Sequence, residues 1–298
     1  MPGLHTVLAA TDLSALARHA VARAALIGAE TGARLSLQHV VNVGAFEALR
    51  HLLDTESDDL QQRLRDEVRD EVQALAAEMA QRHGVAPDVH LVVGSVLGEI
   101  NDHADAIDAD LLVMGARGAG FVRELLIGST TERVLRKSRR SLLVVKQMPH
   151  ETYRRVLLPV DFSARSLEAL RFAQAVAPQA EILLLHAFEV PFEGKLRYAG
   201  VEENALSGLR IHAKRDATAK MNELVSAAGV DEARVRRLVL HGEATTQILT
   251  QEQEQDCDLI VIGKRGLGLF EELLFGSVTK HILAQSSADV LVIDRDTA

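Results

Sequence analysis

The sequence predicts an α/β protein made of two doubly wound parallel sheets, arranged as a tandem repeat. Segment 114–135 returns at 262–283, an offset of 148 residues, with 11 of 22 residues identical. The apolar runs in each copy are short and continuous, which is typical of strands covered by helices on both faces. Helical stretches alternate with these runs, and this alternation indicates a parallel sheet with right-handed crossovers.

Length and composition set the domain count. A chain of 298 residues suits two domains of about 150 residues each, which we place at 1–147 and 152–298, with a linker around 146–155. Hydrophobic residues make up 47% of the chain, enough for two packed cores. The single cysteine, Cys257, excludes a disulfide framework within the chain and is expected to pack as a small hydrophobe.

Charge and hydropathy limit the partners. A net charge of −9 and a pI near 5.7 argue against nucleic-acid binding, which needs a basic face. The longest apolar runs are shorter than the roughly 18 residues that a membrane span requires, and no signal peptide opens the chain. We therefore expect a cytoplasmic protein with no nucleic-acid or membrane partner.

The first half is expected to contain five strands with helices between them. The first apolar run ends at Asp12, and Ser14 can cap the following helix. The second run ends at His39 and Val40. The next helix is amphipathic, because one face carries Leu60, Leu64, Val68, Val72, Leu75 and Met79. Three more strands follow, in the runs VHLVVG, DLLVMG and SLLVVK.

The second half repeats this order. Its first run ends at Asp161, its second at His186, and its later runs are VRRLVLH, DLIVIG and DVLVID. Gly242 aligns with Gly94, and Ile248 aligns with Ile100. Because the two halves agree from end to end, the chain is interpreted as a duplicated domain.

A binding site is expected where parallel strands end and the strand order reverses. Asp12 and Gly115 lie at such strand ends, and Gly128 and Ser129 open the next helix. Exposed N–H groups at a helix start hold anions, and glycine lets a phosphate approach the backbone. The glycines could instead serve only a tight turn, and the two aspartates could simply cap the helices that follow. No P-loop or Rossmann fingerprint is present in the sequence.

The motif in each half resembles the ATP-binding members of the universal stress protein family. These carry Gly-x2-Gly-x9-Gly-Ser/Thr, which the chain matches twice, as Gly115, Gly118, Gly128, Ser129 and as Gly263, Gly266, Gly276, Ser277. The resemblance covers nearly the whole chain. It implies an adenine-nucleotide alpha hydrolase-like, Rossmann-like fold with five parallel strands, and a nucleotide between the first and fourth strands.

The resemblance also implies roles for individual residues. Asp12 and Asp161 would lie near the ribose and the metal-bound phosphates, and Val40 and Ala187 would meet the adenine through their backbone. The glycines would cradle ribose and phosphates together with Ser129, Thr130, Ser277 and Val278, and the loops carry Arg117 and Arg265. Lys264 and Arg265 would make the second loop the more basic one. ATP is the expected ligand, accompanied by Mg²⁺, which Asp12 or Asp161 would help to hold.

The family resemblance implies a stress-response or regulatory protein, and the sequence does not point to an enzyme. No Ser-His-Asp, paired-carboxylate or metal-ligand constellation can be assembled from it, although slow ATP hydrolysis stays open. The last strands, SLLVVK and DVLVID, could pack the halves as an intrachain pseudo-dimer, and two chains could form a homodimer. Two alternatives remain: an interaction scaffold with vestigial nucleotide pockets, and an adenylating or flavin-binding relative. The regulated protein partner is unknown.

Overall fold

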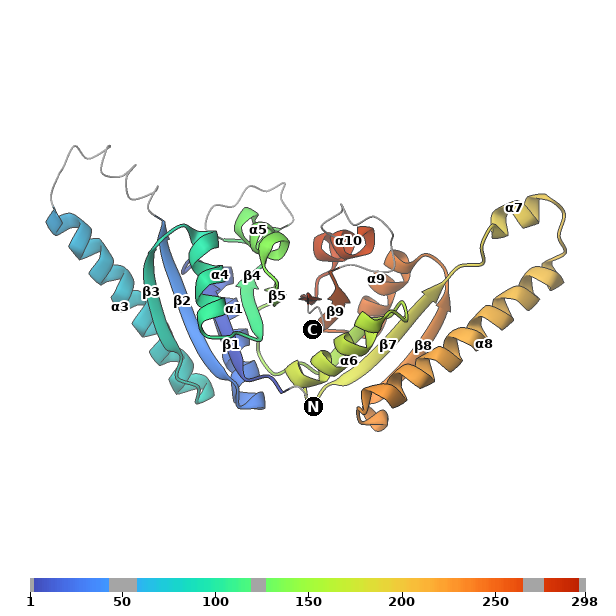
Figure 1. Ribbon diagram of the computed structural model, residues 1–298, viewed down its shortest axis with the longest axis horizontal. Coiled ribbons are helices and arrows are strands. Elements are labelled where there is room, and N and C mark those ends of the chain that lie inside the picture. Colours follow the sequence, from blue (N-terminus) through green and yellow to red (C-terminus); the bar gives the residue numbers. More distant parts are fainter. Residues whose placement is uncertain (1–2, 43–57, 119–126, 265–275, 295–298) are drawn as a thin grey trace. The chain divides into compact units, whose positions relative to one another are not determined.

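Two compact units make up the protein in the computed structural model, which describes residues 3–42, 58–118, 127–264 and 276–294. The division falls between Thr152 and Tyr153, inside the expected linker. The first half spans Gly3–Thr152, and the second half begins at Tyr153. Figure 1 shows the strands and helices of both halves.

The first half is a five-stranded parallel sheet with the order β3-β2-β1-β4-β5. Its strands are β1 (Thr6–Thr11), β2 (Arg34–Asn42), β3 (Asp88–Gly94), β4 (Leu111–Gly115) and β5 (Ser141–Val145). Its helices are α1 (Ala15–Thr31), α3 (Asp58–His83), α4 (Val96–Ala106) and α5 (Ser129–Lys137). The order reverses between β1 and β4, as the sequence predicts for a doubly wound sheet.

Helices cover both faces of this sheet, which explains why the strands β1 and β4 are mostly apolar. Helix α1 packs on β1 and β4 and also contacts α3, whereas α4 packs on β2 and contacts α5 (Figure 1). Every residue of β1, β4 and β5 is buried. Burial on both faces removes the need for alternating polar positions, and this is the continuous pattern seen in the sequence.

The second half repeats the arrangement, with the order β10-β9-β6-β7-β8 and all pairs parallel. Its strands are β6 (Arg155–Pro159), β7 (Glu181–Phe188), β8 (Val235–His241), β9 (Leu259–Gly263) and β10 (Asp289–Ile293). Its helices are α6 (Ala164–Val176), α7 (Glu193–Tyr198), α8 (Glu203–Ala228), α9 (Ala244–Glu254) and α10 (Ser277–Gln285), with a 3₁₀ turn at Glu232–Arg234. The short helix α7 is not among the expected elements.

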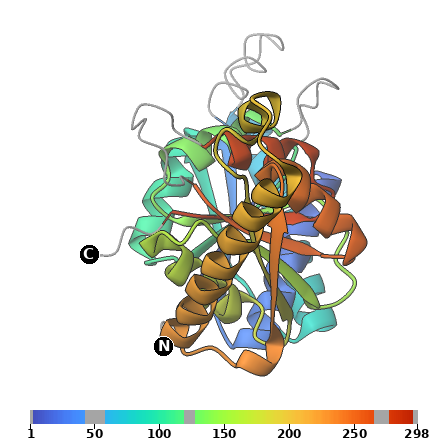
Figure 2. The same cartoon turned by 90° about the vertical axis from the view of Figure 1, so that its right-hand side faces the viewer.

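Helices α6 and α8 contact each other and cover one face of the second sheet, while α9 and α10 contact each other beside β6, β7 and β10. Figure 2 shows α8 as the long helix on the near side, which packs on β7 and β8. Cys257, just before β9, is 6% exposed, as expected for a small core residue. In the described part of the chain, no helix combines the length and apolar character needed to cross a bilayer.

Candidate functional site

A cavity of about 240 Å³ lies at the carboxyl ends of the strands in the first half. Its walls come from the ends of β1, β2 and β4 and the starts of α4 and α5. All eight site residues expected for this half line it: Asp12, Val40, Gly115, Arg117, Gly118, Gly128, Ser129 and Thr130. The structure therefore brings together residues that lie more than 100 positions apart in the sequence.

Two glycines of the cavity wall stand where a side chain would not fit. A β-carbon at Gly115 would come within 3.0 Å of the carbonyl oxygen of Leu16, and one at Gly118 would overlap the carboxylate of Asp12. The missing side chain of Gly115 lets α1 pack closely against the end of β4, and that of Gly118 lets the Asp12 carboxylate approach the turn.

The start of α5 forms the same end of the cavity. Gly128 is its N-cap residue, and the Gly128 N–H donates to the carbonyl oxygen of Ala116 over 2.7 Å. Ser129 and Thr130 follow in the first helical turn and are exposed. The first N–H groups of a helix have no partner within the helix, and together with the dipole they favour an anion. We call this end, formed by Gly115, Gly118, Gly128, Ser129 and Thr130, the glycine end.

Thr131 also lines the cavity, although it is not among the site residues expected from the sequence. Its side chain is 4% exposed, and its hydroxyl donates a 2.9 Å hydrogen bond to the carbonyl oxygen of Gly115. Thr279 makes the same 2.9 Å bond to Gly263 in the second half. Because both halves join the helix to the end of the strand in this way, the shared threonine was the signal that could have identified it.

The carboxylates of Asp12 and Asp161 stabilise the turns into the next helices, which is the structural role that the sequence left open. Asp12 Oδ1 accepts from the N–H of Ser14 over 3.1 Å. Asp161 Oδ1 accepts from the N–H and hydroxyl of Ser163, over 3.0 and 2.6 Å, and from the hydroxyl of Ser166 over 2.9 Å. Ser14 caps α1, as expected, whereas Ser163 occupies the cap position of α6 but donates its hydroxyl to Asp161.

The residue after each aspartate has a left-handed backbone. Leu13 has a φ of 65° and Phe162 a φ of 61°. This conformation costs a non-glycine residue on the order of 1 kcal/mol or more, and such strain clusters at functional sites. Nothing in a leucine or a phenylalanine at this position predicts it.

The other end of the cavity is apolar. Its aliphatic lining residues are Ala10, Val40, Val96, Ile100 and Met114, which we call the apolar end, and Gln38 on β2 lines the same part of the cavity. Val40 was expected to end the second strand, but β2 continues to Asn42. The longer strand pairs with β3 along its whole final segment, through Val40, Val41 and Asn42.

His39 and His186 serve the same structural purpose in the two halves. Their Nδ1 atoms lie 2.9 Å from the carbonyl oxygen of Thr11 and 2.8 Å from that of Val160. A carbonyl oxygen only accepts, so each Nδ1 carries the proton. Burial lowers the pKa of His39 and outweighs the opposing hydrogen bond and the charge of Asp12. A neutral His39 therefore ties the ends of β1 and β2 together.

The second half places its predicted residues on the equivalent elements. Ala187 lies near the end of β7, Gly263 ends β9, Gly276 is the N-cap of α10, and Ser277 and Val278 open that helix. Arg265 and Gly266 lie outside the described residues.

Lys264 does not make the second loop more basic, and the expectation for this residue is wrong. The Lys264 side chain is 8% exposed, and its ammonium group forms an ion pair with the carboxylate of Asp294. Burial and pairing remove its charge from the loop surface. At the equivalent position the first half has Ala116, whose N–H donates to the carbonyl oxygen of Val145.

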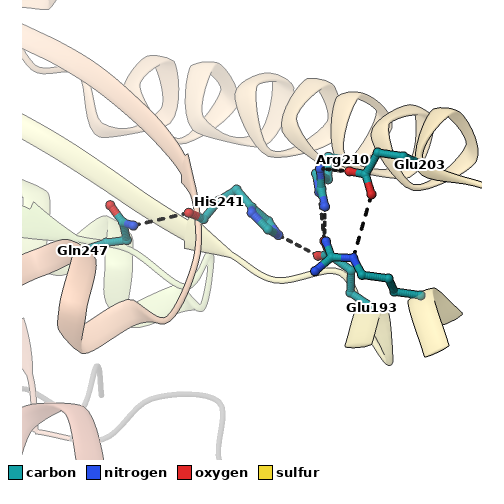
Figure 3. A network of polar contacts seen from close by, with 6 residues as sticks. Glu193, Glu203, Arg210, His241 and Gln247 are labelled. Carbon is teal, nitrogen blue, oxygen red and sulfur yellow. Dashed lines mark hydrogen bonds and ion pairs between the residues drawn. The ribbon is translucent and has the colours of Figure 1, made fainter. Parts of the chain in front are cut away.

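A polar network occupies the carboxyl end of β8 in the second half (Figure 3). The carboxylate of Glu193 on α7 pairs with Arg210 on α8, and its second oxygen lies 2.8 Å from Nε2 of His241. Arg210 also donates to Glu203 over 2.9 Å, and Gln247 donates to the carbonyl oxygen of His241 over 3.3 Å. Hydrogen bonding to Arg210 lowers the pKa of Glu193 against the opposing effect of burial, and His241 adds to it. The network joins α7 to α8 and β8.

Among the described residues, no group of three or more His, Cys, Asp or Glu side chains is placed to hold a metal ion. A magnesium ion bound with a nucleotide does not need such a group, because it takes one or two carboxylates and fills its other positions with water and phosphate oxygens. Asp12 lies at the glycine end, beside Gly118, and it fits that requirement.

Comparison with known proteins places both halves in one family. The model of the universal stress protein family matches residues 3–146 and 152–294. The universal stress protein Rv2623 of Mycobacterium tuberculosis is 26% identical over 230 residues, which cover 72% of this chain and 71% of the relative. The universal stress protein MJ0531 of Methanocaldococcus jannaschii is 30% identical over 146 residues, 48% of this chain and 83% of the relative.

A solved structure shows the same fold across the whole chain. The universal stress protein from Archaeoglobus fulgidus superimposes with a TM-score of 0.68 at 21% identity, covering 98% of this chain and 97% of the other. The likeness at this identity concerns the fold, which is the α/β architecture with two similar halves that the sequence predicts.

Proposed function

The chain belongs to the universal stress protein family, with one family domain in each half, and from that premise we propose that each half binds one ATP with Mg²⁺. The observation that carries the proposal is the cavity of the first half, which has a glycine end and an apolar end. A nucleotide has the same two parts, a charged phosphate chain and a flat, largely apolar base. The arrangement of the lining residues along the cavity gives each part a matching surface.

The glycine end suits the phosphates. Gly115 and Gly118 line this end, and the first turn of α5 presents N–H groups and the hydroxyls of Ser129 and Thr130. Such groups bind anions without a lysine of the P-loop type. Arg117 adds a guanidinium group to the wall, which also attracts phosphate.

The apolar end suits the base. Val40, Val96, Ile100 and Met114 offer aliphatic surface for the two faces of a purine. The backbone of Val40 lies on β2 within this wall, where its N–H or C=O can meet the polar edge of the ring. Asp12, at the carboxyl end of β1, would meet the ribose or the metal-bound phosphates.

The proposed role is regulatory and not catalytic. ATP hydrolysis needs a group that orients the attacking water and a charge clamp at the γ-phosphate. The charged groups that line the cavity are Arg117 and Asp12, and we assign both to binding of the phosphates and their metal ion. We expect bound ATP to persist for many minutes with little ADP formed, so that occupancy reports ATP to a protein partner. An interaction scaffold with vestigial pockets is the alternative, and the intact glycines and Ser129 around the cavity count against it.

The experiment identifies the ligand and its fate together. The native full-length protein is denatured, and the released small molecules are identified by chromatography and mass spectrometry. A nucleotide-free sample is then incubated with Mg-ATP, and ADP is followed over an hour. Adenine nucleotide in the extract and less than one turnover support the proposal. An extract and a reloaded sample that both lack nucleotide would support the scaffold, and robust turnover abolished by Asp161→Ala would make the protein an ATPase.

A further inference from the structure

Gln38 is a polar side chain inside the apolar part of the first half. It lies on β2, is 0% exposed, and lines the cavity. Its neighbours on the same face of β2 are Ser36, whose buried hydroxyl lies 3.0 Å from Nε2 of His103, and Val40, which lines the cavity. A buried amide in such surroundings costs free energy unless both of its polar ends are hydrogen-bonded.

One end of the Gln38 amide is bonded and the other is not. Nε2 donates a 2.9 Å hydrogen bond to the carbonyl oxygen of Glu99, at the start of α4. Because a carbonyl oxygen only accepts, the NH₂ group must face Glu99, and this fixes the position of Oε1. Within the described ranges, Oε1 is buried and has no hydrogen-bond partner. An unsatisfied buried acceptor costs about 1–3 kcal/mol, and a ligand that supplies a donor would remove that cost.

Gln38 lies with the part of the cavity that suits a base. Val40 follows it on the same face of β2, and Val96 and Ile100 lie on α4 beside Glu99, whose carbonyl oxygen holds the amide. The glycine end belongs to β4 and α5 instead. A donor that reaches Oε1 therefore belongs to the base and not to the phosphates or the ribose.

The second half has a leucine at this position. Gln38 pairs with Ala10 in the register of β1 and β2, and Leu185 pairs with Pro159 in the equivalent register of β6 and β7. The following residues, His39 and His186, make equivalent hydrogen bonds. Leu185 is 1% exposed. The fold therefore accepts an apolar residue here, and the amide of the first half is not required for packing.

Resting on the proposed function, we propose that Gln38 determines base specificity in the first half. Its Oε1 accepts a hydrogen bond from the exocyclic amino group of the purine, and Nε2 remains on Glu99 and holds the amide in position. The first half thus selects purine nucleotides that carry an amino group at this edge. The second half, with Leu185, lacks this contact and discriminates less.

The test compares ATP with purine riboside triphosphate, which has hydrogen in place of the amino group. Two full-length variants with a single working site are used. Gly266→Asp disables the site of the second half, and Gly118→Asp disables the site of the first half. Calorimetry gives the dissociation constants of both nucleotides for each chain. In the Gly266→Asp chain, Gln38→Met removes the amide at nearly constant volume, and Leu185→Met in the Gly118→Asp chain is the matched control.

We expect the preference for ATP to be larger in the first half than in the second. A net hydrogen bond of about 0.5–1.5 kcal/mol corresponds to roughly a 2- to 12-fold preference. Gln38→Met should reduce the preference by that factor while changing the affinity for the analogue less than about twofold, and Leu185→Met should leave the ratio unchanged. Gln38→Leu, which copies the second half, should act as Gln38→Met does.

The results that would refute the role of Gln38 differ from the result that would refute the proposed function. Equal preferences for ATP in the two single-site chains would refute the role of Gln38, and this comparison needs no substitution at Gln38. A ratio of the two dissociation constants that Gln38→Met leaves unchanged would refute it as well. Nucleotide binding itself would stand in both cases. Loss of both nucleotides in every chain, with the fold intact by circular dichroism, would refute the proposed function itself.

Discussion

The hydroxyl of Thr131 donates a 2.9 Å hydrogen bond to the carbonyl oxygen of Gly115, and so ties the first turn of α5 to the last residue of β4. Thr279 and Gly263 repeat the bond at 2.9 Å in the second half. Between strand and helix lies the loop that carries the glycine motif. The bond therefore sets the distance between the two parts of the backbone that face the proposed phosphate site.

Thr131→Val is expected to weaken both the fold and the site of the first half. Valine keeps the shape but leaves the carbonyl oxygen of Gly115 without this donor, at a cost of about 1–3 kcal/mol. Urea denaturation should show the lower stability, and calorimetry should show weaker ATP binding to one of the two sites. Thr218→Val is the matched control, because its exposed hydroxyl donates to the carbonyl oxygen of Lys214 within α8, and its effect should stay within about 0.5 kcal/mol. Equal effects of the two substitutions would refute the anchoring role.

Gly118→Asp should abolish one ATP site per chain. A side chain at this position would overlap the carboxylate of Asp12, and it would place a second negative charge where phosphate is expected. Gly208→Asp introduces the same charge at a position of α8 with open space around it, and it should leave stoichiometry unchanged. Full stoichiometry in the Gly118→Asp, Gly266→Asp double variant would refute the assignment of the glycine end.

Cys257 should be unreactive in the folded protein. Burial, assisted by the nearby charges of Asp258 and Glu252, raises the pKa of its thiol to about 12. Only the thiolate reacts, so its fraction at pH 8 falls by about a thousandfold or more relative to an unfolded thiol of pKa about 8.5. Labelling with a disulfide reagent should be that much slower than in guanidinium. Comparable rates in the two conditions would show that Cys257 is exposed.

Glu243 should make the stability of the second half depend on acidic pH. Burial raises its pKa, but hydrogen bonds from the N–H groups of Thr245 and Thr246, at 2.8 and 2.7 Å, outweigh burial and lower the pKa to about 2. A carboxylate with a depressed folded pKa stabilises fully above its unfolded pKa of about 4.3. This stabilisation is lost as the pH falls from there toward 2.

The variant Glu243→Gln isolates this effect, since glutamine keeps the size and does not titrate. At pH 6 the wild type should be more stable by about 1 kcal/mol, the usual value of an N-cap. The difference should shrink steadily at pH 4 and pH 3 in urea titrations. A difference that is constant from pH 6 to pH 3 would show that the carboxylate does not cap α9.

Much of this molecule could be predicted from its sequence because duplication displays the same constraints twice. The glycines recur with Ser129 and Ser277 at fixed spacing, and continuous apolar runs mark strands buried on both faces. Both signals are local. The eight residues expected for the first half accordingly lie around one cavity, although their contact with a ligand stays a prediction.

The remaining features depend on neighbours that lie far away in the sequence. Lys264 looks like a loop cation until its pairing with Asp294 is seen. Leu13 and Phe162 have left-handed backbones, each between a strand end and a helix start, and neither side chain favours that conformation. Two hints in the sequence were missed: the threonine shared as Thr131 and Thr279, and Gln38, an amide at the position where the other copy has Leu185.

The most direct test of the central claim is a calorimetric titration of Mg-ATP into the nucleotide-free full-length chain. Saturation is expected at two ATP per chain, one in each half. Saturation at one ATP would show that only one half binds nucleotide, and a folded chain that binds no ATP would refute the proposed function.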